Sequence, residues 1–138
     1  MVFVELASVQ QSPICLGTGN AFPVAGQAED CLFIDVYAPT RAKSTSKLPV
    51  FFFIQGGGYI ADANPNFNGT GLVTAGDLDL IVVTFNYRVG LFGFLASTEI
   101  QRDGDLNAGF LDQRKALQWV QEHITQVKEI QSRCYIPC

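Results

Sequence analysis

The sequence has no cluster of lysine or arginine, although it is 138 residues long. Its 9 basic and 13 acidic side chains give a net charge of −4, which disfavours nucleic acid as a partner. No apolar run has the length that a membrane span needs, so no membrane-spanning segment is expected. The opening residues, MVFVELASVQQSPIC, lack the basic and continuously apolar parts of a signal peptide, and the localisation of this chain stays open.

Cysteine is sparse, with four residues in two groups. Cys15 and Cys31 enclose a segment rich in Gly, Ala and Pro, and their spacing permits either a disulfide or two unrelated buried thiols. Cys134 and Cys138, in CYIPC, have neither the second ligand pair nor the histidine that a zinc site needs. The sequence therefore indicates no metal site, and no other cofactor is expected.

Apolar residues are abundant, at 48%, and include 11 phenylalanines. Three apolar stretches predict strands: CLFIDVYAP (31–39), PVFFFIQ (49–55) and LIVVTFNYR (80–88). The second and third are almost continuously apolar, as in strands that are covered on both sheet faces. Residues 61–79 predict a long loop with at most a short helix near 71–76, and VGLFGFL predicts a glycine-punctuated turn.

A longer helix is predicted to start at Asn107, a good N-cap, and to include AGFLDQRKALQWVQEHI. Apolar residues at helical spacing predict one buried stripe, made of Leu111, Leu117, Val120, Ile124 and Val127. Residues 1–30 carry glycine and proline breaks and are expected to be irregular. Strand, crossover, strand and helix together predict an α/β fold with a mostly parallel sheet and crossover helices.

The three consecutive glycines in PVFFFIQGGGYIADA need a reason, because glycine loses more backbone entropy on ordering than any other residue. Dinucleotide binding is one interpretation, since Gly56, Gly58 and Ala61 fit G-x-G-x-x-A, and Asp77 and Asp79 follow about 20 residues later. A dinucleotide-binding motif should be followed by a helix, but the polar segment DANPNFNGTG follows here. The ribose-binding acid should lie at the end of the next strand, whereas both aspartates precede that strand. A tight turn beneath another segment is a second interpretation, but it needs one or two glycines rather than three.

An oxyanion hole is the third interpretation of the glycine loop. Backbone N–H groups at the C-terminal end of a buried strand can point at a carbonyl oxygen that becomes negative during acyl transfer. Glycines leave those amides accessible, and lipase- and esterase-type hydrolases use a glycine-rich loop in this way. The glycine loop therefore favours ester hydrolysis over cofactor binding.

Four segments, in order, resemble the type-B carboxylesterase/lipase family, the cholinesterase-like branch of the α/β hydrolases: EDCLFIDVYAP, PVFFFIQGGGY, NYRVGLFGFL and NAGFLDQRKALQWVQEHI. The first matches that family's EDCLxxxVYxP signature. The resemblance runs from about Cys15 to Ile124. It implies the N-terminal part of a carboxylesterase domain over residues 1–124, with a tail outside the family over 125–138. The implied fold is a partial α/β-hydrolase fold that is incomplete at both ends.

The resemblance also implies roles for single residues. Gly57 and Gly58 correspond to the oxyanion-hole donors, and Tyr59 to an aromatic position that lines the gorge of the family. Cys15 and Cys31 correspond to the family's early disulfide, which closes on the cysteine of EDC.

Charged residues have counterparts as well. Arg88, at the end of an apolar strand, and Asp112, near the start of the long helix, resemble a structural ion pair, with two solvated surface charges as the alternative. Glu29 resembles a carboxylate whose arginine partner lies in an upstream segment that this chain does not have. Apart from the family, NGT at Asn68 is an N-glycosylation sequon, which matters only in the secretory pathway.

The sequence has no G-x-S-x-G, the motif on which an esterase of this type carries its nucleophile. None of its serines lies in such a context, and its one histidine, His123, lies in the predicted structural helix. The catalytic serine, acid and histidine are therefore expected to be absent. Because the resemblance ends after Ile124, where TQVKEIQSRCYIPC follows, we expect a truncated or misassembled gene product.

The function implied for the parent protein is hydrolysis of a small-molecule or lipid carboxylic ester through an acyl-enzyme, by a secreted protein without cofactor or metal. The chain itself is expected to be inactive alone. Two alternatives stay open, a non-catalytic binding or adhesion member of the family and a non-functional truncated product. In a truncated product, the strands VFFFI and LIVVTF would have uncovered edges and faces, so poor solubility is expected. The sequence does not indicate the oligomeric state.

Overall fold

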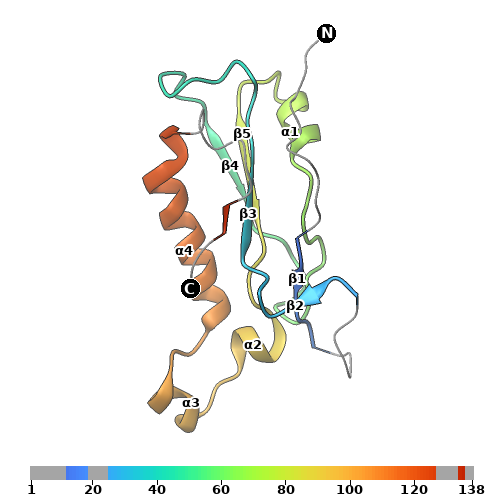
Figure 1. Ribbon diagram of the computed structural model, residues 1–138, viewed down its shortest axis with the longest axis vertical. Coiled ribbons are helices and arrows are strands. Elements are labelled where there is room, and N and C mark those ends of the chain that lie inside the picture. Colours follow the sequence, from blue (N-terminus) through green and yellow to red (C-terminus); the bar gives the residue numbers. More distant parts are fainter. Residues whose placement is uncertain (1–11, 19–24, 127–133, 136–138) are drawn as a thin grey trace.

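The computed structural model describes residues 12–18, 25–126 and 134–135 (Figure 1). The strands are β1 (Ile14–Cys15), β2 (Gln27–Ala28), β3 (Phe33–Tyr37), β4 (Val50–Phe53), β5 (Ile81–Phe85) and β6 (Cys134–Tyr135). The helices are α1 (Thr70–Ala75), α2 (Gly90–Phe94), α3 (Thr98–Asp103), α4 (Ala108–His123) and a short 3-10 turn, η1 (Ile124–Gln126). The three predicted strands and the short helix near 71–76 are confirmed.

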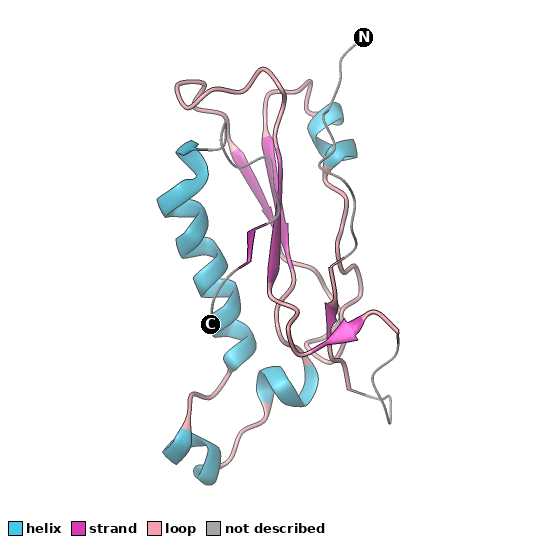
Figure 2. Cartoon of the chain, in the orientation of Figure 1, coloured by secondary structure: helices cyan, strands magenta, loops and turns pink. Residues whose placement is uncertain are grey.

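The central sheet has the strand order β4-β5-β3-β6, and α4 and α1 lie on either side of it (Figures 1 and 2). The α/β class is confirmed, but the sheet is mixed rather than mostly parallel. β4 pairs parallel with β5, while β3 pairs antiparallel with β5. The reason is the polar linker between β3 and β4, which reverses the chain through turns, whereas a parallel neighbour would need a crossover.

Residues of the predicted tail take part in this sheet. Cys134 and Tyr135 form β6, which pairs antiparallel with the start of β3. The division of the chain at residue 124 stays a prediction, and a strand at 134–135 shows that the tail can contact the rest of the fold.

The core lies around β5, which is buried along its whole length. Ile34 from β3, and Tyr87 and Val89 just after β5, are also buried, and Ala116 and Val120 pack on this layer from α4. β4 differs, because it has a strand partner on one side only within the described residues and exposes Phe51. The expectation of two covered faces is therefore confirmed for β5 and wrong for β4.

α4 starts directly after Asn107, as predicted, although the Asn107 side chain makes no capping hydrogen bond. The predicted buried stripe is wrong in part, because Leu111 and Leu117 are 38% and 42% exposed. The buried face consists of Gly109, Asp112, Ala116 and Val120. Val127 lies outside the described residues.

Close approach explains which face of α4 is buried. A Cβ on Gly109 would lie 2.4 Å from the carbonyl oxygen of Arg88 and 2.6 Å from the Phe94 ring. Only a residue without a side chain permits that contact, so the face with Gly109, rather than the face with the leucines, turns toward the segment that follows β5.

Other differences from the sequence predictions are local. The predicted turn VGLFGFL contains the one-turn helix α2, and the predicted irregular N-terminal segment contributes the short parallel pair β1 and β2. α3 begins after Ser97, whose hydroxyl oxygen accepts a hydrogen bond from the Ile100 N–H at 3.2 Å. In the part of the chain that the structure describes, no helix is long and apolar enough to span a membrane.

Candidate functional site

The glycine loop leaves the C-terminal end of β4, at the same end of the sheet as β1, β2 and α2 (Figure 1). Its backbone turns through positive φ values of 130° at Gly57, 62° at Gly58 and 64° at Tyr59. A Cβ on Gly57 would lie 1.7 Å from the carbonyl oxygen of Ala61, whereas a Cβ on Gly56 would meet nothing within 4 Å. Glycine is therefore required at 57 by space and conformation, and at 58 by conformation.

The hydrogen bonds of the turn leave its first amides, from Gly56 to Tyr59, without an acceptor among the described residues. The N–H groups of Ile60 and Ala61 donate to the Gly57 carbonyl, at 3.1 and 3.3 Å, and the Ala63 N–H donates to Gly56 at 3.1 Å. Within residues 12–18, 25–126 and 134–135, the Gly57 and Gly58 N–H groups have no acceptor. The Gly57 and Gly58 amides, the pair that the family resemblance implies, are therefore free of these residues and can bind an oxygen from outside this part of the chain.

The turn is held in place by neighbouring segments. The Thr18 N–H donates to the Ile60 carbonyl at 2.8 Å, and the Gly90 N–H donates to the Tyr59 carbonyl at 2.7 Å. The buried Tyr87 hydroxyl donates to the Gln55 carbonyl, at the start of the loop, at 2.9 Å. Donors from two parts of the sequence, Thr18 and the segment from Tyr87 to Gly90, thus hold three carbonyls of the loop.

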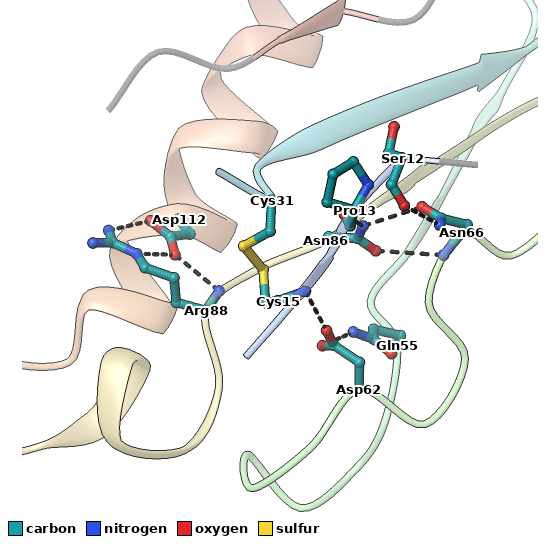
Figure 3. Close-up of a disulfide and its surroundings, with 10 residues drawn as sticks. All are labelled: Ser12, Pro13, Cys15, Cys31, Gln55, Asp62, Asn66, Asn86, Arg88 and Asp112. Carbon is teal, nitrogen blue, oxygen red and sulfur yellow. Dashed lines mark hydrogen bonds and ion pairs between the residues drawn. A yellow bond between two sulfur atoms is a disulfide. The ribbon is translucent and has the colours of Figure 1, made fainter. Parts of the chain in front are cut away.

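Asp62 closes the base of the loop (Figure 3). Its Oδ2 accepts the Cys15 N–H at 3.0 Å, and its Oδ1 accepts from the Gln55 side-chain amide. The Gln55 Oε1 in turn accepts the Asn64 N–H at 3.0 Å. Burial raises the pKa of Asp62 to about 6, because the two hydrogen bonds lower it by less than desolvation raises it.

Aromatic rings stand beside the turn. Tyr59 lies 5.0 Å from Phe94 and 5.3 Å from Phe110 between ring centroids, and the latter two are 5.2 Å apart. Tyr59 and Phe110 are exposed, so the cluster offers an apolar surface next to the free amides. The correspondence of Tyr59 to a gorge-lining position stays a prediction.

The predicted disulfide is confirmed. Cys15 and Cys31 are joined, with their Cα atoms 5.0 Å apart, and both residues are buried. Figure 3 shows this bond between the Asp62 hydrogen bonds on one side and the pair of Arg88 and Asp112 on the other.

The predicted ion pair is also present. The Arg88 side chain contacts both oxygens of Asp112, and the Arg88 backbone N–H donates to Asp112 Oδ2 at 3.0 Å. The Asp112 side chain is buried, so the alternative of two solvated charges is wrong. Glu29 is exposed and forms no ion pair among the residues that the structure describes.

His123 lies at the end of α4, far along the helix from the turn (Figure 1). Its ring centroid is 5.2 Å from that of Trp119, and its Nε2 is 3.9 Å from Glu122. The interpretation of His123 as a structural rather than a catalytic histidine stays a prediction. Among the described residues, no group of three or more His, Cys, Asp or Glu side chains is arranged to hold a metal ion.

Asn68 is exposed just before α1. Its Oδ1 accepts the Thr70 N–H at 2.9 Å, which closes a local turn within the sequon. The Thr70 hydroxyl is buried and has no hydrogen-bond partner among the residues that the structure describes.

Sequence reasoning missed two groups of polar residues that hold the site. One is Gln55 with Asp62; the other is Asn86, whose Nδ2 donates to Asn66 Oδ1 at 3.1 Å, while Asn66 Nδ2 donates to the Ser12 carbonyl at 2.8 Å. The only local signal was the polar residue at the end of each apolar strand, Gln55 and Asn86, where side chains can reach neighbouring loops.

The profile of the carboxylesterase family matches residues 5–127. The chain belongs to the carboxylesterase family. It is 47% identical over 105 residues to the secreted triacylglycerol lipase LIP1 of Gibberella zeae, a match that covers 74% of this chain and 18% of the lipase. A carboxylic ester hydrolase of Bombus ignitus is 41% identical over 126 residues, which are 87% of this chain and 22% of that protein.

Solved structures agree with this assignment. The crystal structure of Aspergillus niger EstA superposes with a TM-score of 0.78 and 55% sequence identity, over 83% of this carboxylesterase chain and 22% of EstA. The likeness confirms a partial α/β-hydrolase fold. The chain spans about a fifth of the length of these three relatives, 18% of the Gibberella lipase and 22% of each of the other two.

Proposed function

We propose that this chain supplies the oxyanion-binding loop of a serine carboxylic-ester hydrolase. The observation that carries the proposal is the pair of free N–H groups at Gly57 and Gly58, at the end of β4 in a member of the carboxylesterase family. In acyl transfer, a nucleophilic serine adds to the ester carbonyl, and the carbonyl oxygen becomes negative in the tetrahedral intermediate. Two amides held in advance by the surrounding segments stabilise that charge without reorganising.

The turn has the rigidity that this role requires. Three of its carbonyls, at Gln55, Tyr59 and Ile60, accept hydrogen bonds from neighbouring segments and are engaged there. A negative oxygen at the two amides therefore meets donors without an opposing carbonyl from these residues. The exposed rings of Tyr59 and Phe110 beside the turn suit the apolar part of an ester.

The substrate of the whole protein is, in this proposal, a small-molecule or lipid carboxylic ester. Support comes from the relatives, which are named a triacylglycerol lipase and a carboxylic ester hydrolase. Secretion of the parent protein is proposed on similar grounds, because two fungal relatives are named as secreted. The buried disulfide is consistent with an oxidising compartment.

The isolated 138-residue chain is proposed to be inactive, because it contains no G-x-S-x-G to carry a nucleophile. Incubation of the purified chain with p-nitrophenyl butyrate should release p-nitrophenol at the rate of buffer alone. Hydrolysis above that rate, if it purifies with the chain, would refute the inactivity.

The donor role needs a complete catalytic domain for its test. We suggest a chimera in which residues 14–124 replace the matched segment of the Gibberella zeae lipase. The chimera should hydrolyse the ester. Gly57→Ala keeps its N–H, but its Cβ would lie 1.7 Å from the Ala61 carbonyl oxygen and displace the turn, so kcat should fall about 100-fold or more, as when an oxyanion donor is misplaced. Gly56→Ala is the matched control, since a Cβ there meets nothing within 4 Å. An active chimera that tolerates Gly57→Ala as well as Gly56→Ala would contradict the proposal.

A further inference from the structure

One side chain, that of Asp62, joins the glycine loop directly to a cysteine of the disulfide. Asp62 Oδ2 accepts the Cys15 N–H at 3.0 Å across 47 positions of sequence. The other oxygen of the same carboxylate accepts from Gln55, at the opposite end of the loop. Asp62 thus bridges the two ends of the glycine turn and the first cysteine of the disulfide.

We propose that Asp62 is a positioning residue, which fixes the turn of Gly57 and Gly58 against the Cys15–Cys31 disulfide. The catalytic meaning of this tether rests on the function proposed above. Whether Asp62 holds the loop in place does not depend on any ester substrate.

Burial of the partners explains why the tether is needed. Gln55 is only 3% exposed, and its Oε1 also holds the Asn64 N–H at 3.0 Å. Its side-chain amide has Asp62 as its acceptor, and bulk water has little access to replace it. Removal of the carboxylate would leave buried donors on Gln55 and Cys15, which favours an opened loop.

The carboxylate has a geometric advantage over neutral side chains of its size. Its two oxygens accept separate donors from two directions, whereas an amide offers one oxygen and places an N–H where the second acceptor stood. The same placement removes water from the Asp62 carboxylate and disfavours its charged form, which raises its pKa to about 6. Because burial of the Asp62 carboxylate is unfavourable, we explain its presence by the position that it gives to the loop rather than by a gain in overall stability.

The experiment is hydrogen–deuterium exchange of the full chain, read by mass spectrometry on peptides that cover residues 55–64. Asp62→Ala should make these amides exchange about tenfold faster or more, while peptides from β5 stay unchanged. Asp62→Asn keeps one acceptor oxygen and should recover part of the protection. It also preserves volume, so it remains informative if the alanine variant does not fold. Asp79→Ala removes an exposed carboxylate and is the matched control, with exchange at 55–64 as in the unmodified chain.

The second arm tests the link to the disulfide. Reduction of Cys15–Cys31 in the unmodified chain should speed exchange at residues 55–64, and the same reduction in Asp62→Ala should add little. Such non-additivity means that the disulfide acts on the turn through Asp62.

Three results would overturn the proposal. One is exchange at 55–64 within twofold of the unmodified chain in both Asp62 variants. Another is an equal increase in β5, which would make Asp62 a residue needed for folding in general. The third is additivity of reduction and substitution. None of these readouts involves an ester, so an active lipase chimera that tolerates Gly57→Ala would refute the proposed function and leave this result intact.

Discussion

The guanidinium of Arg88 lies against the carboxylate of Asp112, with Nη2 2.5 Å from Oδ1 and Nε 2.8 Å from Oδ2. The two side chains are 33% and 6% exposed, so the carboxylate is in the interior while one side of the arginine meets solvent. The contact joins the segment after β5 to the first half of α4. Because α2 and the glycine turn adjoin that segment, the pair fixes the helix that borders the candidate site.

Asp112→Ala is expected to destabilise the chain by about 3 kcal/mol, because it leaves the Arg88 donors without these acceptors in a largely buried place. The free energy of unfolding can be measured in urea, with the fluorescence of the single tryptophan, Trp119 in α4, as the probe. The chain offers a matched control in Arg41 and Asp79, a pair at 2.6 Å whose side chains are 62% and 70% exposed. Asp79→Ala should cost less than about 1 kcal/mol. Equal losses for the two variants would contradict the structural role of Asp112.

Local patterns were sufficient to predict the three longest strands, β3, β4 and β5, and the helices α1 and α4. β5 and β3 follow from runs of β-branched and aromatic residues, and α4 begins after Asn107 as its capping residue suggests. The family resemblance added the pairing of Cys15 with Cys31 and of Arg88 with Asp112. In each case the relevant information lies in a short segment or in a motif that identifies the family.

What could not be predicted depends on contacts between distant segments. Leu111 and Leu117 fit a helical stripe, but the close approach at Gly109 selects another face of α4. The direction of β3 depends on how its linker crosses the sheet, which no residue of the strand specifies. Asp62 lies in a loop whose sequence gives no sign that its carboxylate reaches Cys15.

Gly57→Ala should disrupt the turn in the chain itself. The new Cβ would lie 1.7 Å from the Ala61 carbonyl oxygen, at a residue whose φ is 130°. Strain and overlap together suggest a loss of about 3 kcal/mol in the free energy of unfolding. Gly56→Ala, in open space, should change it by less than about 1 kcal/mol, so equal effects at the two positions in urea unfolding would contradict this geometry.

The raised pKa of Asp62 predicts a pH dependence of stability. Burial, opposed by the hydrogen bonds from Gln55 and Cys15, raises it from 3.8 to about 6. Between about pH 4 and pH 6 the folded chain therefore holds a proton that the unfolded chain has released. The free energy of unfolding contains a favourable contribution below about pH 4 that is lost as the pH rises through 6.

Asp62→Asn stays neutral and isolates this contribution. Relative to it, the unmodified chain should lose stability as the pH rises from 4 to 7, in urea unfolding followed at several pH values. Tyr87, whose own pKa is raised by burial and then by the charges of Asp62 and Tyr59, titrates above this range. A difference between the two proteins that does not change with pH would show that Asp62 titrates in the folded chain as it does in the unfolded one.

Asn68 is predicted to carry an N-linked glycan when the chain passes through the secretory pathway. It is exposed in a loop, its sequon NGT is complete, and the buried disulfide fits the same route. Expressed with a signal peptide in a eukaryotic host, the protein should run at a higher mass that peptide N-glycosidase F removes. Thr70→Ala should abolish the shift at little cost to the fold, since the Thr70 hydroxyl has no hydrogen-bond partner among the described residues, whereas Thr70→Ser keeps the sequon and the shift. A glycosidase-sensitive shift that persists in Thr70→Ala, or its absence in the secreted unmodified protein, would contradict modification at Asn68.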